Sequence, residues 1–382
     1  MEVLRRVALG LLADTPAARA LKRARELTIP LFLIGALFAP VTGEAAWFRG
    51  NTHAHTINSD GNAAPDSVVR WYREHGYQFI VLTDHDYLTD AAPLQAMFGA
   101  EGQFVVIPGE EVTQMVAGSD PLRPGAGKRA AHVTAINISR EVIPAGEGSG
   151  VMGRTAPSGT TLAQTFEDNL ALIREAGGIG QINHPNFLWS VGVEDMAQLP
   201  DGTLFEVWNG HPLINNLGGT NDAGHKALST EELWDALLSR GKRLWGVASD
   251  DSHDYHDLAN ADSPRPGRGW IVVRAERLAP DTIVESLRRG DFYASTGITL
   301  ADYRASDREI EIDIYPGTRF GNRMIPTDSR YLTRFIGKGG RVLAEVPGTR
   351  PRYSLRGDEG YVRAVVVDAN GNRAWTQPVF PN

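Results

Sequence analysis

The sequence predicts an α/β fold, in which a parallel barrel of alternating strands and helices is followed by a small antiparallel β module. Short continuous apolar runs, such as Phe79–Leu82 and Phe104–Ile107, are typical of strands that are covered on both faces. Several of these runs end in polar residues, as the carboxyl ends of barrel strands do. After about residue 298 the pattern changes to strict alternation, as in Glu309–Ile314, which predicts strands with one exposed face.

The predicted elements follow one another from Trp47 and Phe48, where the first strand begins. A helix opens at Pro65, because proline is favoured at the first helical position, and it closes at Gly76. Apolar residues spaced by three or four predict another helix over residues 161–176. Short apolar runs predict further strands at 131–138, 179–182, 204–208, 244–248 and 270–273. Further helices are predicted at 231–240 and 281–289.

Two stretches within the predicted barrel, residues 112–130 and 139–160, are rich in Gly, Pro and Ser. We expect them to be loops over the barrel mouth, where long loops are often functional. The domain organisation that follows is a targeting or anchoring segment at 1–45, a barrel at 46–297 and a β-rich module at 298–382. We expect the module to be a structural appendage that packs on the barrel.

The composition narrows the possible functions. With 382 residues, 42 % of them hydrophobic and 22 % charged, the chain can build a large core and is not globally disordered. The absence of cysteine excludes disulfides, thiolate metal sites and cysteine nucleophiles. Residues 46–382 hold 32 basic and 42 acidic residues, and this acidic balance disfavours nucleic acid as a partner.

The first 45 residues have the pattern of an export signal. Basic residues up to Arg25 precede an apolar run at 27–39, which is shorter than the roughly 20 residues that span a bilayer. Gly43 and Ala45 supply small residues for a cleavage site, so we expect a mature N-terminus near Ala46 and a periplasmic or secreted protein. The alternative is an uncleaved segment that serves as the only membrane contact.

Histidines and acids gather at the predicted strand ends. His53 and His55 point to the same face of a strand, because side chains alternate along it. Each such residue alone is more often incidental than a ligand, but nine of them at one end of a barrel predict a metal centre. Nitrogen and oxygen donors without thiolates suit Zn, Mn or Fe. The nine predicted ligands are His53, His55, Asp60, His85, Glu111, His132, His184, Asp251 and His253.

The order of these motifs resembles that of the PHP (polymerase and histidinol phosphatase) superfamily. The matching segments are His53-x-His55, Asp60-Gly61, Thr83–Asp86, Pro108–Glu111, Asn183–Pro185 and Asp251-x-His253. The tail Arg289–Gly297, which precedes the β module, is similar to that of the carbaryl-hydrolase-like (CehA/McbA) branch. The resemblance implies a distorted (β/α)7 barrel that holds two or three divalent metal ions.

The resemblance also implies how the ligands are shared. His53, His55, Glu111 and Asp251 would hold the first ion, and Glu111 would bridge to a second ion held by His132 and His184. Asp60, His85 and His253 would hold the third. Asp86, which could orient ligands, and His211, which could contact substrate, are the expected catalytic residues.

These features predict an exported metal-dependent hydrolase that acts on a small-molecule ester through a metal-bridging hydroxide. No Gly-x-Ser-x-Gly elbow offers another nucleophile. The superfamily resemblance favours a phosphoester, and the branch resemblance leaves a carbamate or carboxyl ester open. A non-catalytic metal-binding protein is the alternative of a different class. Arg154, Lys226 and Arg268 are available to bind a phosphate.

Overall fold

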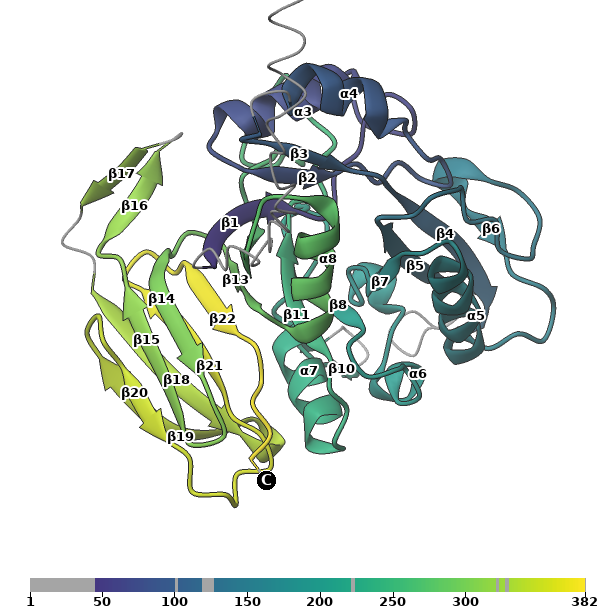
Figure 1. Ribbon diagram of the computed structural model, residues 1–382. Helices are drawn as coiled ribbons and strands as arrows, with labels where there is room; N and C mark the ends of the chain where they lie inside the picture. Colours follow the sequence, from purple (N-terminus) through teal and green to yellow (C-terminus); the bar gives the residue numbers. More distant parts are fainter. Residues whose placement is uncertain are drawn as a thin grey trace, which may run out of the picture. The chain divides into compact units, whose positions relative to one another are not determined.

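The computed structural model describes residues 45–99, 102–118, 127–220, 224–320, 323–326 and 330–381. Apart from Ala45, the expected targeting segment lies outside these residues, so export and cleavage stay predictions. Within the described part of the chain, no helix has both the length and the apolar character needed to cross a membrane. The secondary structure is mixed α/β, with many strands and few helices (Figure 1).

A nine-stranded sheet contains the first three strands of the chain. Strands β1 (Ala46–Asn51), β2 (Phe79–Val81) and β3 (Val105–Ile107) run parallel to one another. On the other side of β1, strand β12 (Trp270–Ala275) pairs antiparallel with it, and β13 (Phe292–Ser295) pairs antiparallel with β12. All residues of β2 and β3 are buried, as their continuous apolar sequence predicts.

A second sheet has six strands in the order β11-β8-β7-β5-β4-β6. Strands β7, β8 and β11 run parallel, whereas β5 is antiparallel to both of its neighbours, β4 and β7. The six strands are β4 (Gly109–Ala117), β5 (Lys128–Ile136), β6 (Arg154–Thr155), β7 (Ile179–Ile182), β8 (Leu204–Asn209) and β11 (Trp245–Ser249).

The prediction of a loop over residues 112–130 was therefore partly wrong. Residues 112–117 and 128–130 belong to the antiparallel pair β4–β5. The strand was hard to recognise because Thr113 and Gln114 are buried within it, and these polar side chains interrupt the apolar run that marks a covered strand.

The predicted (β/α)7 barrel is not confirmed. The two sheets meet at isolated bridges, His85 to Glu111 and Ala54 to Ser252, instead of forming one continuous ladder. Only Pro108 separates β3 from β4, so no crossover helix can lie between these strands. The structure supports a strand-rich α/β fold in which some parallel strands are replaced by antiparallel ones.

The helices largely begin and end where the sequence predicts. Proline occupies the first turn of α3 and of α8, and the Thr161 hydroxyl accepts a hydrogen bond from the Gln164 amide to cap α5. Helix α4 had not been predicted. The helices are α3 (Pro65–Glu74), α4 (Ala91–Phe98), α5 (Leu162–Glu175), α6 (Val193–Met196), α7 (Thr230–Ser239) and α8 (Pro280–Arg289), with single 3₁₀ turns η1 (Gly150–Met152), η2 (Phe187–Trp189) and η3 (Lys338–Gly340).

The C-terminal strands extend the nine-stranded sheet. Strand β22 pairs with β13, and the sheet continues through β21, β18 and β19, so main-chain hydrogen bonds join residues on both sides of the expected boundary at 298 (Figure 1). Alternate burial along β15 agrees with its alternating sequence. The remaining strands are β9 (Gly219–Thr220), β10 (Lys226–Ala227), β14 (Leu300–Ala305), β15 (Glu309–Ile314), β16 (Gly317–Phe320), β17 (Arg323–Pro326), β18 (Tyr331–Gly337), β19 (Arg341–Pro347), β20 (Arg352–Ser354), β21 (Arg363–Asp368) and β22 (Arg373–Thr376).

Two clusters of buried apolar side chains form the core. One contains Phe166 of α5, Trp234 of α7 and Leu287 of α8 together with the inner strands. The other contains Tyr72 of α3 and continues into the C-terminal strands through Phe335. The segments that follow the parallel strands are held between these packed elements, and they carry the polar residues described next.

Candidate metal centre

The structure brings all nine predicted ligands together in overlapping groups. Within each group the nitrogen and oxygen atoms lie within 4.8 Å of one another. Most of these residues follow the carboxyl ends of parallel strands, which belong to both sheets. His53 and His55 follow β1, Asp60 lies in the next turn, His85 follows β2, Glu111 and His132 lie in β4 and β5, His184 follows β7, and Asp251 and His253 follow β11.

His53 and His55 have the spacing of ligands around a common ion. Their Nε2 atoms are 3.2 Å apart, and each lies 3.2 Å from Oδ1 of Asp251. The Oε2 atom of Glu111 is 3.3 Å from Nε2 of His53 and 3.4 Å from Nε2 of His55. Ligand atoms bound at about 2.0–2.1 Å to a tetrahedral zinc ion are about 3.3 Å apart, so the donors present fit a divalent metal.

Glu206 fixes the orientation of the His53 ring. It is fully buried, and its Oε1 atom accepts a hydrogen bond from Nδ1 of His53 at 2.8 Å. Because the proton is then on Nδ1, the lone pair of Nε2 points toward Asp251 and Glu111. Buried carboxylates that orient metal-ligating histidines in this way are a common feature of metal sites.

Glu111 faces different histidines with its two carboxylate oxygens. Its Oε1 atom lies 3.1 Å from Nδ1 of His132 and 3.2 Å from Nε2 of His184. Its Oε2 atom faces His53 and His55 and lies 3.1 Å from Nδ1 of His85. Oε2 is buried without a hydrogen-bond partner. A carboxylate that bridges two cations has this arrangement.

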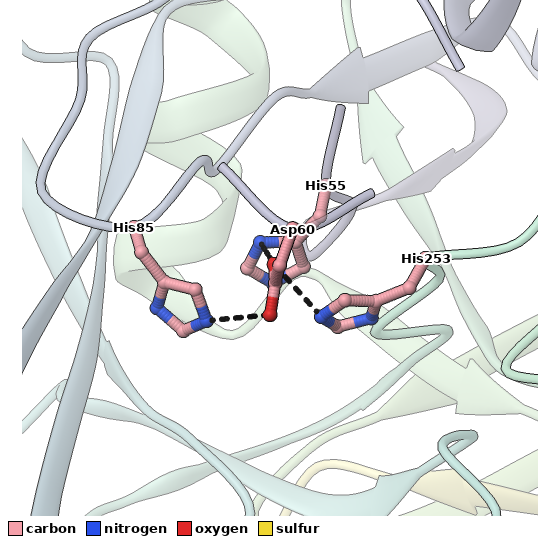
Figure 2. Close-up of side chains that lie close together, drawn as sticks. All are labelled: His55, Asp60, His85 and His253. Carbon is pink, nitrogen blue, oxygen red and sulfur yellow. Dashed lines mark ion pairs between the residues drawn. The ribbon is translucent and has the colours of Figure 1, made fainter. Parts of the chain in front are cut away.

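A further group surrounds Asp60 near the surface (Figure 2). The Oδ1 atom of Asp60 is 3.2 Å from Nε2 of His253 and 3.5 Å from Nδ1 of His55, and its Oδ2 atom is 3.7 Å from Nε2 of His85. Nδ1 of His253 donates to the main-chain carbonyl of Asp251 at 2.9 Å, so Nε2 faces the carboxylate. This group contains the three residues that the sequence assigned to a third ion, with His55 in addition.

The groups of neighbouring donor atoms differ in part from the predicted assignment of ligands to three ions. His85 lies within reach of Glu111 and His132, and His184 lies within reach of His53 and Asp251. Several residues therefore belong to more than one group. The assignment of individual ligands to individual ions stays a prediction.

Carboxylates raise the pKa of two histidines in this centre. Burial opposes protonation of His53, yet the carboxylates of Asp251, Glu111 and Glu206 raise its pKa well above the usual value. Burial also opposes protonation of His253, whereas Asp60 and Asp251 raise its pKa to about 9. Divalent cations compete with such protons, because ligands bind metal in their deprotonated form.

Three residues of the centre have an unusual backbone conformation. Asp86, His184 and Asp251 have φ angles of 46°, 23° and 50°. Non-glycine residues in this region cost about 1–3 kcal/mol each and cluster at functional sites. Two of these residues, His184 and Asp251, are candidate metal ligands that follow strand ends.

Neighbouring acids point in different directions, as alternation along a strand predicts. Glu111 faces the metal-binding groups, whereas Glu110 accepts a hydrogen bond from the Val142 amide at 2.9 Å. Asp250 accepts from the Tyr72 hydroxyl at 2.8 Å and so anchors the end of β11 to α3.

The two expected catalytic residues have different surroundings. Asp86 accepts hydrogen bonds from the amides of Thr113 and Gly150 at 3.0 and 3.1 Å, which suits a positioning role. His211 lines the pocket over the centre, and its Nδ1 atom accepts from the Leu213 amide at 3.2 Å. Burial lowers the pKa of His211 to about 4, so the neutral ring presents its Nε2–H as a hydrogen-bond donor.

The pocket over the centre has a volume of about 400 Å³. Asp60, His85, Glu111, His132, His184, Asp251 and His253 line it. None of the three basic residues proposed from the sequence, Arg154, Lys226 and Arg268, lines this pocket. Lys128, at the start of β5, does line it.

Sequence reasoning missed several supporting residues. Glu206 could have been noticed as an acid within the apolar run of β8. Asp84 accepts hydrogen bonds from the Thr56 amide and the Ser59 hydroxyl at 2.7 and 2.9 Å, which holds the turn that carries Asp60. Lys128 gave no local signal, because only the β4–β5 pairing brings it to the pocket.

Comparisons with known proteins give weak similarities. No family model matches the chain. Phosphoglucosamine mutase from Synechococcus sp. (strain WH7803) is 26 % identical over 239 residues, which cover 57 % of this chain and 45 % of that protein. The chain thus spans less than half the length of this curated relative.

Two solved structures give matches of low similarity to this chain. One is a two-domain protein from Bacteroides vulgatus ATCC 8482 that contains a predicted PHP-like metal-dependent phosphoesterase; it has 15 % sequence identity and a TM-score of 0.46, and the match covers 88 % of this chain and 96 % of that one. The other is a candidate metal-dependent phosphoesterase from Bifidobacterium adolescentis ATCC 15703, with 16 % identity, a TM-score of 0.36 and coverage of 63 % and 96 %. Because these sequence identities and TM-scores are low, the proposed function is based on the side chains of this chain.

Proposed function

We propose that this chain is a metal-dependent hydrolase, with phosphoesters as its leading substrate class. The observation that carries this proposal is the position of Glu111, a buried residue whose two carboxylate oxygens face separate sets of imidazoles within a cluster of nine candidate nitrogen and oxygen ligands. Such donors suit Zn, Mn or Fe, as the sequence predicts.

Two or three divalent ions at this centre would lower the pKa of water and polarise the oxygen on which charge develops during hydrolysis. The residues of the chain would orient these groups. Glu206 holds the His53 ring through Nδ1, and Asn183 donates to Oε1 of Glu111 at 2.8 Å. His211 would donate its Nε2–H to a substrate oxygen, and the Lys128 ammonium would attract an anionic ester from the wall of the pocket.

A carbamate or carboxyl ester is the second candidate substrate class. It is favoured by the many apolar residues that line the pocket, and by the small number of basic groups there. These residues are Met115, Val151, Met152, Phe187, Leu188, Leu213 and Ile214. A phosphate pocket usually contains several Arg or Lys donors, whereas Lys128 is the one basic residue among the described residues that line this pocket.

A panel of phosphomonoesters, phosphodiesters, carbamates and aryl esters, tested on protein of measured metal content, would distinguish these proposals. We expect hydrolysis that requires added Zn, Mn or Fe and stops on chelation. If metal-loaded protein hydrolyses none of these esters faster than the metal-free control, the non-catalytic metal-binding function becomes the leading proposal. The relative rates on phosphoesters and carbon-centred esters decide between the first two classes.

We also propose that the protein is exported to the periplasm or secreted, with its N-terminal segment as the sole membrane contact if that segment is retained. The basic and apolar pattern before residue 40 supports this. N-terminal sequencing of protein from the native cell should begin near Ala46. Recovery of residues 1–40 on a cytoplasmic protein would contradict it.

A further inference from the structure

The walls of the pocket differ in chemistry from its floor. The floor consists of the histidines and carboxylates of the metal centre, whereas apolar side chains from four separate segments form much of the walls. Met115 lies in β4, Met152 in η1, Leu188 in η2, and Leu213 in the segment after β8. Because separate segments contribute, the apolar walls are a property of the assembled pocket.

Some of these side chains are unusually exposed for apolar residues. Met152 is 82 % exposed and Leu213 is 77 % exposed, and both line the same pocket. Exposed apolar residues that gather around a polar cavity often mark a ligand-binding surface. Neither is needed to fill the core, since most of each residue's surface faces solvent.

The backbone of η2 holds a further part of the wall close to the metal ligands. Leu188 and Trp189 have φ angles of 54° and 57°, a conformation that non-glycine residues rarely adopt. The neighbouring Phe187 ring lies with its centroid 5.2 Å from that of His184 and 5.7 Å from that of His132. This turn therefore contains an aromatic side chain beside two candidate ligands and an aliphatic side chain that lines the pocket.

From this arrangement we propose that the pocket selects anionic esters whose alcohol part is a compact apolar group, such as an aromatic ring. The anionic end would lie over the metal centre and near Lys128, and the apolar part would contact Phe187, Leu188, Met152 and Leu213. The volume of about 400 Å³ suits a small molecule of this kind better than a polymer. This inference rests on the proposed hydrolase function, because it places the reacting end over the metal centre.

Binding of two phosphonates to metal-loaded protein tests the inference without turnover. Phenylphosphonate and methylphosphonate carry the same anionic group, and neither has an ester bond to break. We expect phenylphosphonate to bind at least about tenfold more tightly by calorimetry, since contacts with an apolar pocket discriminate by about this factor or more. Equal affinities would overturn the proposal.

Variants at the exposed positions sharpen this test. The double substitution Met152→Ser and Leu213→Ser should remove most of the phenyl preference, while methylphosphonate affinity and metal content stay unchanged. The matched control is Met97→Ser, because Met97 is also exposed, at 63 %, but lies on α4 and does not line the pocket. A double variant that keeps the full preference would show that these walls do not contact the ligand.

The same proteins distinguish this inference from the proposed function. Matched alkyl esters, benzyl phosphate and glycerol phosphate, report on turnover. Hydrolysis of both with equal kcat/KM values would support the hydrolase and overturn the apolar selectivity. A preference for phenylphosphonate in a protein that hydrolyses no ester would overturn the hydrolase but retain an apolar, anion-binding pocket.

Discussion

The metal centre and the junction between α7 and β21 are both buried and charged, but they differ in what balances their charges. At the junction, Arg363 is fully buried and its Nε and Nη2 atoms each lie 2.7 Å from an oxygen of Asp235. The Tyr361 hydroxyl donates to the same carboxylate at 2.8 Å. Arg373 adds an ion pair with Glu231 at 2.6 Å.

In the described part of the chain, no ion pair with a lysine or arginine is found for Asp60, Glu111 or Asp251 of the candidate metal centre. Its carboxylates face imidazoles, which are neutral unless protonated, and Oε2 of Glu111 has no hydrogen-bond partner. A buried cluster whose carboxylates are neutralised by arginines of the same chain stabilises the fold. A cluster in which carboxylate and imidazole lone pairs converge can instead bind a cation. Four predictions test this distinction, from the largest expected effect to the smallest.

The substitution Glu111→Gln should have the largest effect. It removes the charge that we propose is shared by two ions, so at least one ion per chain should be lost and hydrolysis should fall to the level of the metal-free protein. We expect a loss of metal affinity of more than about a hundredfold, since residues that merely support ligands cost 10–100-fold. Elemental analysis and turnover measure this. Unchanged metal content would show that Glu111 is not a ligand.

The substitution Asp235→Ala should instead destabilise the fold. Removing one partner of a buried ion pair leaves Arg363 uncompensated and costs about 3–5 kcal/mol in the free energy of unfolding. Denaturant titration measures this. The matched control is Asp235→Leu with Arg363→Met, which removes both charges and should recover much of the loss. Equal destabilisation in the single and double variants would mean that packing, not charge, dominates the junction.

Added metal should stabilise the wild-type protein. An ion that binds only the folded state adds about 2.7 kcal/mol when its free concentration is a hundred times Kd. The midpoint of thermal unfolding should therefore rise with Zn or Mn in wild type and much less in Glu111→Gln. An equal rise of the unfolding midpoint in both proteins would show that the metal binds at a site that does not include Glu111.

The substitution Glu206→Gln should have the smallest effect of the four. Glutamine retains an acceptor for His53 Nδ1 but lacks the negative charge that increases the basicity of the ring, so metal affinity should fall by about 10–100-fold. The control is Glu194→Gln, because Glu194 is a surface residue that pairs with Arg240. Metal titration measures the affinity of both variants. Equal metal affinities in Glu206→Gln and Glu194→Gln would contradict the role of Glu206.

The segment that follows β22 is hydrogen-bonded to a strand that leads into the candidate metal centre. The Gln377 side chain accepts from the Gly246 amide and donates to the Gly246 carbonyl, both at 2.8 Å, and Gly246 lies in β11. Asp251 and His253 follow the end of this strand. The sequence predicted that the module packs on the barrel but not these hydrogen bonds, because no local pattern shows which distant residues meet.

The sequence by itself determined the local features of this protein. Apolar runs marked β2, β3 and β8, proline and glycine marked the limits of α3, and polar residues at strand ends identified all nine residues that the structure brings together. The strand and helix predictions succeeded because each depends on a few neighbouring residues, whereas metal binding by the nine residues stays a prediction. Alternation along a strand placed Glu110 and Glu111 on opposite faces, and the resemblance to the PHP motifs selected Glu111.

Only the tertiary structure decided how these pieces combine. The antiparallel pairing of β5, the position of Lys128 in the pocket and the hydrogen bond from His53 to Glu206 all depend on residues that are distant in the sequence. The expected barrel was not confirmed for the same reason, because strand order follows from the packing of whole elements. Contacts over such separations depend on the simultaneous burial of many side chains, which no single segment encodes.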